Sequence, residues 1–268
     1  MLLNVAEELE KARENGYAIG AFNTANLEVT KAICEAAKEC DTPILIQTTP
    51  KAIEYAGLEQ LYDIVINEIE ETKIDAAVHL DHAKDIDIIR EAIDQGYKSV
   101  MFDGSKLPLD ENIKITKEVV EYAHEHGVSV EGEVGVIGSS ESGQGAYSDP
   151  ADVKRFVEET GVDAVAVSVG NEHGAPEGEH IDIELLKEIA AIVKIPLVMH
   201  GSSGLSDEDI HAAISVGVAK FNIDTNIKKV FTESIENSKS EDYRETLQQG
   251  EEKVEEVVKR YIKLFSNN

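Results

Sequence analysis

The chain has 268 residues, of which 53 are acidic and 25 are lysine or arginine, so its formal net charge at pH 7 is −28. Nucleic acids and anionic membrane surfaces are bound through clustered lysine and arginine, and this charge argues against both kinds of partner. The length and an apolar content of 42% are typical of one large α/β domain, here expected over residues 1–268.

The N-terminal residues 1–10 are acidic and helical in pattern, without the basic region and apolar run of a signal peptide. No apolar run approaches the roughly 20 residues that span a bilayer. We therefore expect a soluble, cytoplasmic protein. Cys34 and Cys40 would face different sides of one helix, so no disulfide is expected.

Eight short β-rich runs alternate with amphipathic helical stretches along the chain. The runs are apolar almost throughout, which indicates strands that are covered on both faces. The expected strands are Tyr17–Thr24, Pro43–Thr49, Ala76–His82, Ser99–Gly104, Ser129–Gly135, Ala164–Gly170, Pro196–Gly201 and Ala219–Thr225. The expected helices between them are Leu27–Lys38, Leu58–Glu71, Asp85–Gln95, Glu111–His126, Pro150–Thr160, Ile183–Val193 and Asp207–Val216.

Strict alternation of strands and helices implies a parallel sheet with right-handed crossovers. Eight such units in about 225 residues have the number and length of a (β/α)₈ TIM barrel. An open, doubly wound sheet would usually carry a glycine-rich dinucleotide motif, which the sequence lacks. The tail, residues 227–268, is expected to add C-terminal helices. Ser240 and Asp242 can cap the last helix, whose apolar stripe from Val254 to Leu264 must cover either the barrel or a partner subunit.

Polar residues gather at the expected carboxyl ends of the strands, where barrel enzymes carry their chemistry. His82, His173 and His200 end strands three, six and seven and would meet at the barrel mouth. Three imidazoles with a free fourth position are typical of catalytic zinc, and a carboxylate such as Glu133 can assist them. Asp81 places a second carboxylate beside His82.

Glycine-rich strand ends offer backbone N–H groups to an anion. His173-Gly174 and His200-Gly201-Ser202-Ser203-Gly204 supply two of them, and Asn222–Thr225 follows the eighth strand. The loops after strands seven and eight form the phosphate site of many barrels. The sequence therefore predicts a phosphate site beside the histidines.

In this order the motifs resemble those of the class II, metal-dependent ketose-bisphosphate aldolases, almost from end to end. The resemblance implies a lyase that reversibly cleaves a ketose bisphosphate, most commonly fructose 1,6-bisphosphate. The products would be dihydroxyacetone phosphate and glyceraldehyde 3-phosphate, formed through a zinc-stabilised enediolate. The matching stretches are Gly20–Asn23, His79–His82, Val100–Ser105, Glu131–Gly135, Tyr147–Pro150, His173-Gly174, His200–Gly204 and Asn222–Thr225.

The resemblance also implies roles for single residues. Asp81 would exchange a proton with the C4 hydroxyl, and Glu141 would move the carbon-bound proton of the donor. Asn222 would hold the enediolate. The metal ligands would be His82, His173 and His200, with Glu133 as an alternate ligand.

The substrate itself, a small sugar phosphate, would be contacted by residues from several strand ends. A monovalent cation, Na⁺ or K⁺, is expected near its donor phosphate, and the assembly is expected to be a homodimer or homotetramer. The expected substrate contacts are Asn23, Thr49, Gly174, Gly201, Ser203, Asp224, Thr225 and Lys228.

Departures from the family pattern concern the phosphate on the aldehyde side. Glu177 and Glu251 stand where relatives often carry basic residues. Lys228 and Lys106 are the candidates that remain for this phosphate. The substrate could therefore be tagatose 1,6-bisphosphate or another ketose or keto-acid phosphate.

Two alternatives belong to other classes of function. In a zinc hydrolase, Asp81 would activate a metal-bound water, although such an enzyme has no general need for the phosphate glycines. A non-catalytic sugar-phosphate binding protein would need neither Asp81, Glu141 nor Asn222, and all three are present.

Overall fold

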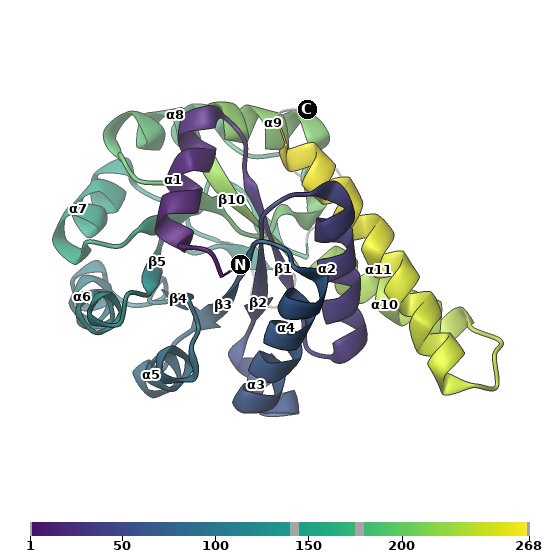
Figure 1. The fold of residues 1–268 in the computed structure, drawn as a ribbon. Coiled ribbons are helices and arrows are strands. Elements are labelled where there is room, and N and C mark those ends of the chain that lie inside the picture. Colours follow the sequence, from purple (N-terminus) through teal and green to yellow (C-terminus); the bar gives the residue numbers. More distant parts are fainter. Residues whose placement is uncertain (1, 140–144, 175–179, 267–268) are drawn as a thin grey trace.

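The computed structural model describes residues 2–139, 145–174 and 180–266. Eight parallel strands close into a barrel in the order β1-β10-β9-β7-β5-β4-β3-β2, and helices surround it (Figure 1). The expected TIM barrel is thus confirmed. Its strands are β1 (Ile19–Asn23), β2 (Ile44–Thr48), β3 (Ala76–Ala83), β4 (Ser99–Phe102), β5 (Ser129–Val134), β7 (Ala164–Val167), β9 (Leu197–Met199) and β10 (Val218–Ile223).

The helices agree with the expected ones to within about two residues at most ends, the usual uncertainty of helix termini. Those that follow strands β1 to β9 are α2 (Leu27–Cys40), α3 (Pro50–Ala56), α4 (Leu58–Thr72), α5 (Ile86–Gln95), α6 (Leu109–Glu125), α7 (Pro150–Thr160), α8 (Ile183–Ile192) and α9 (Asp207–Ser215). The sequence did not predict α3, which starts at the Thr49 cap with Pro50 in its first turn. It also missed the short parallel pair of β6 (Gly138–Ser139) and β8 (Glu172–His173), which lies outside the barrel sheet.

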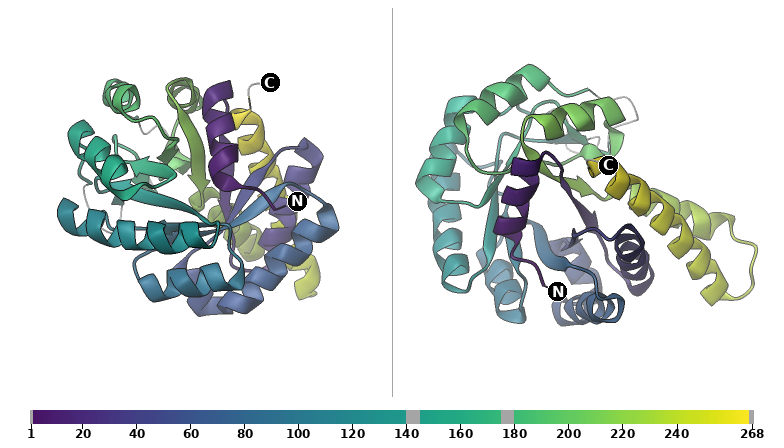
Figure 2. Two further views of the ribbon diagram at one scale, coloured as in Figure 1. Left: turned by 60° about the vertical axis from the view of Figure 1, so that its left-hand side comes forward. Right: turned by 45° about the horizontal axis from the view of Figure 1, so that its top comes forward.

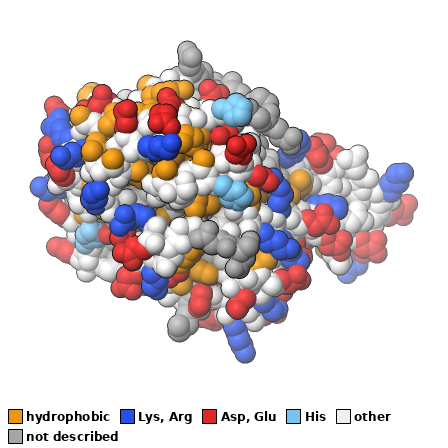
Figure 3. Space-filling model, turned by 90° about the horizontal axis from the view of Figure 1, so that it is seen from above, with side chains coloured by type: hydrophobic (Ala, Val, Ile, Leu, Met, Phe, Trp, Pro, Cys, Tyr) orange, Lys and Arg blue, Asp and Glu red, His pale blue; other side chains and the backbone are white. Residues whose placement is uncertain are grey.

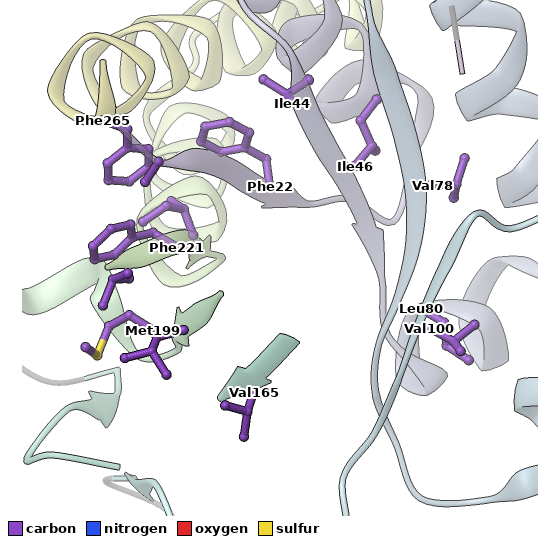
Figure 4. Close-up of a cluster of buried hydrophobic side chains, with 14 of the residues drawn as sticks. Phe22, Ile44, Ile46, Val78, Leu80, Val100, Val165, Met199, Phe221 and Phe265 are labelled. Carbon is purple, nitrogen blue, oxygen red and sulfur yellow. The ribbon is translucent and has the colours of Figure 1, made fainter. Parts of the chain in front are cut away.

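Between strands and helices lies the larger hydrophobic core. Outward-facing strand residues such as Phe22, Ile46 and Val78 are fully buried there, and Figure 4 shows such side chains pointing away from the barrel axis. Along each strand they alternate with residues that face the barrel interior. The position of a residue within its strand therefore decides whether it packs in this core or lines the interior.

The barrel interior is apolar at one end and polar at the other. Small residues, including Ala21, Ala77 and Ala164, form the apolar end together with Val5 and Leu9 of α1 (Val5–Asn15). α1 crosses this end of the barrel in Figures 1 and 2. Ser129, at the start of β5, accepts the backbone N–H of Ala6 in α1 at 3.1 Å, while the histidines and carboxylates of the candidate site line the opposite end, where the strands finish.

Two helices follow the barrel, α10 (Thr225–Asn237) and α11 (Tyr243–Phe265). They project together as an arm (Figures 1 and 2), while the C-terminal half of α11 lies on the barrel. Val254, Val258 and Phe265 are buried there, so the apolar stripe covers the barrel. Asp242 caps α11 by accepting the backbone N–H of Arg244 at 2.9 Å.

The surface carries the excess of acidic residues. Lysine and arginine side chains lie scattered among acidic ones over the face seen in Figure 3. Within the described ranges, no helix is long and apolar enough to cross a membrane. Cys34 and Cys40 are free thiols, as expected.

Candidate active site

A cavity of about 620 Å³ opens at the carboxyl ends of the barrel strands. It brings together all the expected substrate contacts, and the catalytic and metal candidates with two exceptions. His200 is fully buried beneath it, and Glu141 lies outside the described residues. The lining residues are Asn23, Thr49, Asp81, His82, Lys84, Asp103, Ser105, Lys106, Glu133, Val136, Ile137, His173, Gly174, Gly201, Ser203, Asn222, Asp224, Thr225 and Lys228.

A bulge at the end of β3 turns two consecutive side chains toward this cavity. In a regular strand Asp81 and His82 would point to opposite faces. Here the register with β4 shifts between Leu80 and Ala83, and His82 has φ 53°, in the left-handed region. Such a bulge re-aims one side chain, and a non-glycine residue in this region marks a constrained position. The carboxylate and the imidazole therefore both line the cavity.

The three expected histidines converge. Their candidate ligand nitrogens all lie within 4.8 Å of one another. His82 Nδ1 faces Asp103 Oδ2 at 3.3 Å, and His200 Nε2 faces Glu131 Oε1 at 2.7 Å. An ionised carboxylate only accepts, so each of these two outer nitrogens carries a proton.

The inner nitrogens of the same rings, His82 Nε2 and His200 Nδ1, face each other. Burial disfavours a charged His82, but its pKa is raised to about 10 by the neighbouring carboxylates of Asp81, Asp103 and Glu133. Without a metal, the cationic His82 donates from Nε2 to His200 Nδ1 at 2.9 Å, and a bound cation would take the place of that proton. Neutral imidazole nitrogens are also preferred ligands of zinc. The arrangement of these rings fits a metal ion with His82, His173 and His200 as ligands.

Glu133 fits the same ion. Its Oε2 is buried and has no hydrogen-bond partner among the residues that the structure describes. It lies 3.7 Å from His200 Nδ1. Burial and the neighbouring Asp103 carboxylate raise the pKa of Glu133 to about 8. A cation at this place would offset the cost of the buried carboxylate.

Asp81 is held on both of its oxygens. Asn23 Nδ2 donates to Oδ2 and Asn222 Nδ2 donates to Oδ1, each at 3.0 Å. Burial opposes ionisation, but His82 and the other positive groups nearby lower the pKa of Asp81 to about 2. The carboxylate is therefore ionised at neutral pH and ready to accept a proton.

The glycine-rich loops are shaped by close backbone packing. Gly201 has φ 64°, and a Cβ at this position would lie 2.6 Å from the backbone carbonyl of Glu172. The next residues form the single turn η1 (Ser202–Gly204). Asn226 Nδ2 donates to the Ser203 carbonyl at 3.0 Å, which ties this turn to α10. The loop after β9 thus has a fixed shape, with Gly201 and Ser203 at the cavity.

Two acidic residues were expected to depart from the family pattern near the phosphate of the aldehyde half, and neither can be placed at the cavity. Glu251 lines a different groove, between α2 and α11, and pairs with Lys31 at 3.5 Å. Glu177 lies outside the described residues. Lys228 and Lys106 both line the cavity, and Lys228 forms an ion pair with Asp224.

Sequence reasoning assigned no role to Asp103, Lys84 or the buried pair of Glu131 and Lys220. Two signals pointed to that pair. Glu131 stands two residues before Glu133 and hence on the same face of β5. Lys220 interrupts the apolar strand β10, where a charged residue needs a partner.

The family model described as fructose-bisphosphate aldolase class-II matches residues 3–268. The chain belongs to this family. Fructose-bisphosphate aldolases of Staphylococcus aureus (strain Mu50) and Staphylococcus epidermidis (strain RP62A) are each 38% identical to it over 281 aligned positions, covering 100% of this chain and 98% of theirs. Membership makes the protein a lyase, as expected, and decides against the hydrolase and the non-catalytic alternatives.

Solved structures agree with the family. The YdjI aldolase of Escherichia coli K12 superposes with a TM-score of 0.90 at 30% identity, over 99% of this chain and 98% of that one. A putative fructose-1,6-biphosphate aldolase of Coccidioides immitis gives 0.90 at 29% identity, over 98% and 96%. The class II aldolases therefore share the closed barrel seen here.

Proposed function

We propose that the protein reversibly cleaves fructose 1,6-bisphosphate to dihydroxyacetone phosphate and glyceraldehyde 3-phosphate, with a zinc ion held by His82, His173 and His200. The observation that carries the proposal is an ionised carboxylate, Asp81, beside three converging imidazoles. The name of the staphylococcal relatives supports fructose over the C4 epimer tagatose.

The metal ligands proposed are the three histidines, with Glu133 as an alternate ligand. Its Oε2 has no hydrogen-bond partner in the described ranges and lies 3.7 Å from His200 Nδ1. When bound, the zinc would act as a Lewis acid toward the negative charge that develops on the donor after C3–C4 cleavage.

Asp81 accepts the proton of the C4 hydroxyl during cleavage and returns it in the reverse direction. Its two amide donors, Asn23 and Asn222, hold the carboxylate in place. The buried Oδ1 of Asn222 has no partner among the described residues and is proposed to accept a donor hydroxyl. Glu141 keeps its expected role, transfer of the carbon-bound proton, as a prediction.

The donor phosphate is proposed to bind at Gly174, Gly201, Ser203 and Thr225, which line one part of the cavity. Asp224 is also there, and burial raises the pKa of its carboxyl. Lys228 pairs with this carboxylate here. If Lys228 turns to the phosphate of the aldehyde half, a Na⁺ or K⁺ ion is proposed to supply the positive charge beside Asp224 and the donor phosphate. Lys228 and Lys106 are proposed for the phosphate of the aldehyde half, and Asn23 and Thr49 for further contacts with the sugar.

Exchange of the donor's carbon-bound proton tests the proposal. The protein is incubated with dihydroxyacetone phosphate in D₂O, with and without a chelator, and the proton signal is followed by NMR. We expect stereospecific exchange that a chelator abolishes and zinc restores. Absence of exchange in zinc-loaded protein would contradict the proposed mechanism.

The choice of sugar needs its own assay. Cleavage of fructose and tagatose 1,6-bisphosphates is compared under the same conditions, with fructose 1-phosphate as the test of the distal phosphate. We expect the highest kcat/KM for fructose 1,6-bisphosphate. A preference for tagatose 1,6-bisphosphate would keep the reaction but change the substrate.

We also propose a homodimer or homotetramer. Leu27 and Tyr243 are large apolar residues, 44% and 73% exposed, that line one groove between α2 and α11. The mass in solution, measured by light scattering, is expected to be at least twice 29.3 kDa. A monomeric mass would refute this part of the proposal.

A further inference from the structure

A buried chain of polar side chains lies inside the barrel. Lys220 Nζ donates to Glu131 Oε2 at 2.7 Å, and Glu131 Oε1 accepts from His200 Nε2 at 2.7 Å. His79 continues the chain on the other side, with Nε2 3.5 Å from Lys220 Nζ and Nδ1 2.8 Å from Ser99 Oγ. Lys220, His79 and His200 are fully buried, and Glu131 is 2% exposed.

Stability alone gives little reason for this arrangement. A buried ion pair loses the hydration of both charges, and well-packed apolar residues of similar volume are often at least as stabilising. The apolar cluster of the barrel interior is built from alanine, valine, leucine and isoleucine, so the same barrel also closes around apolar side chains. The chain does, however, end on one candidate metal ligand, His200.

Glu131 determines which nitrogen of His200 carries the proton. An ionised carboxylate has no proton to donate, so the hydrogen bond at Nε2 requires an N–H there. The lone pair is then on Nδ1, which lies 2.9 Å from His82 Nε2 and faces the cluster. The opposite tautomer would direct an N–H at the metal position and leave Nε2 without its bond.

Lys220 compensates the negative charge of Glu131. Glu131 Oε2 accepts from Lys220 while Oε1 accepts from His200, so the lysine compensates the buried charge without occupying the oxygen that holds the ring. The contacts of Lys220 fix it in turn, since its Nζ lies between Glu131 and His79.

We infer that Glu131 and Lys220 are positioning residues of the metal centre. Glu131 holds the tautomer and orientation of His200, and Lys220 keeps Glu131 charged and in place. The inference rests on the proposed histidine metal site, and neither residue touches the substrate cavity. Partners of this kind typically change metal affinity or activity by about 10- to 100-fold when they are removed.

The first test is Glu131→Gln, which keeps the shape of the side chain but lets an amide N–H face His200. Zinc affinity is measured by competition with a chelator, and the ring tautomers of the metal-free protein by ¹⁵N NMR. We expect zinc binding to weaken by about 10- to 100-fold, and His200 to lose its single Nε2–H tautomer. Tyr97→Phe is the matched control, because it removes another buried hydrogen bond, that to Thr48, outside this chain.

The second test separates positioning from folding. Lys220→Met alone leaves Glu131 buried without its countercharge, so the double variant E131Q/K220M is made beside it. We expect the double variant to fold better than K220M and still to bind zinc about as weakly as E131Q. Rescue of zinc affinity in the double variant would show a structural role only.

The outcomes separate the inference from the proposed function. If the parent protein does not bind zinc through these histidines, the proposed function fails. If the parent binds zinc and catalyses exchange while E131Q keeps parental zinc affinity and the Nε2–H tautomer, the positioning role is refuted and the proposed function stands.

Discussion

The orientation and the pKa of single residues in this protein are set by the side chains around them. Asp81 shows this most clearly, because each of its oxygens has an amide donor and its pKa is about 2. Such a carboxylate is a poor general acid in the free enzyme at neutral pH but an available base. The same side chain in solvent would have neither the fixed orientation nor the low pKa.

Replacing Asp81 with alanine should therefore separate chemistry from metal binding. We expect kcat for cleavage to fall by about 10²- to 10⁴-fold, the usual contribution of a positioned acid–base group. Zinc content should stay the same, because Asp81 is in neither group of candidate metal ligands. Steady-state kinetics and metal analysis of the same preparation check both parts, and an unchanged kcat would refute the role.

Cys34 illustrates burial without function. Its side chain is fully buried, and burial, with Glu68 and Glu35 adding to it, raises the pKa of the thiol to about 12. Because the thiolate is the reactive form, Cys34 should not react with a thiol reagent at about pH 8 in the folded protein.

The measurement counts thiols before and after unfolding. The parent should show at most one reactive thiol when folded and two when unfolded. Cys40→Ser should remove the one that reacts in the folded state. Fast labelling of Cys34 in folded C40S would show that this part of the core opens readily.

At the scale of elements, the loops that carry the phosphate glycines owe their shape to backbone packing. Gly201 and Gly161 both have left-handed φ, 64° and 74°. They differ in the room for a side chain, since a Cβ at Gly161 would meet only Val120 at 3.9 Å. A Cβ at Gly201 would meet the Glu172 backbone at 2.6 Å.

The pair Gly161→Ala and Gly201→Ala therefore makes a matched comparison. G161A should lower the free energy of unfolding by about 1–2 kcal/mol, the cost of left-handed backbone for alanine. G201A should cost more and also weaken zinc binding, because displacement of Glu172 moves the next residue, His173. Urea unfolding and zinc competition measure the two effects. Equal behaviour of both variants would show that the loop accommodates the methyl group.

Most of the barrel was predictable from sequence because its strands are buried on both faces and its helices are amphipathic. The strands were found with errors at their ends, while α3 and the β6–β8 pair were missed. Helix α3 has seven residues and strand β6 has two, and segments this short show no clear hydrophobic period. The candidate site residues came from the strand ends and the family motifs; those that the structure describes line the cavity or lie beneath it, and their roles stay predictions.

Two features of the site were beyond the sequence. The bulge that turns His82 toward Asp81 depends on the register between β3 and β4, which no local pattern encodes. The contact of Lys220 with Glu131 joins strands that are far apart in sequence, β10 and β5. The sequence reveals that both are charged, but only the closed barrel shows that they meet.

The whole molecule carries a net charge of −28, and self-repulsion of this size destabilises the folded state at low ionic strength. Raising NaCl from about 0.05 M to about 0.5 M shortens the Debye length. We therefore expect Tm to rise by a few degrees over this range, as measured by calorimetry of the zinc-loaded protein.

The control is the same salt comparison at a pH near the isoelectric point. Near the isoelectric point the net charge vanishes, and the rise in Tm should become small there. A rise of equal size at both pH values would point to preferential exclusion of salt in place of charge screening.

The barrel closes where β1 pairs with β10, Ala21 opposite Asn222. The end of α11 spans this seam. The Phe265 carbonyl accepts the N–H of Ala18 at 3.0 Å, and the Phe265 ring stacks on the Phe221 ring with 4.9 Å between the ring centroids. Figure 4 shows Phe265 beside Phe221 and Phe22. Both strands of the seam also deliver a donor to Asp81, Asn23 from β1 and Asn222 from β10.

Opening of the seam would therefore move apart the two amide donors of Asp81. The last turn of α11 thus helps to hold closed the seam whose two strands carry the donors of Asp81. In amide hydrogen exchange, the protection of Ala18 would report how often this turn of α11 detaches from the seam.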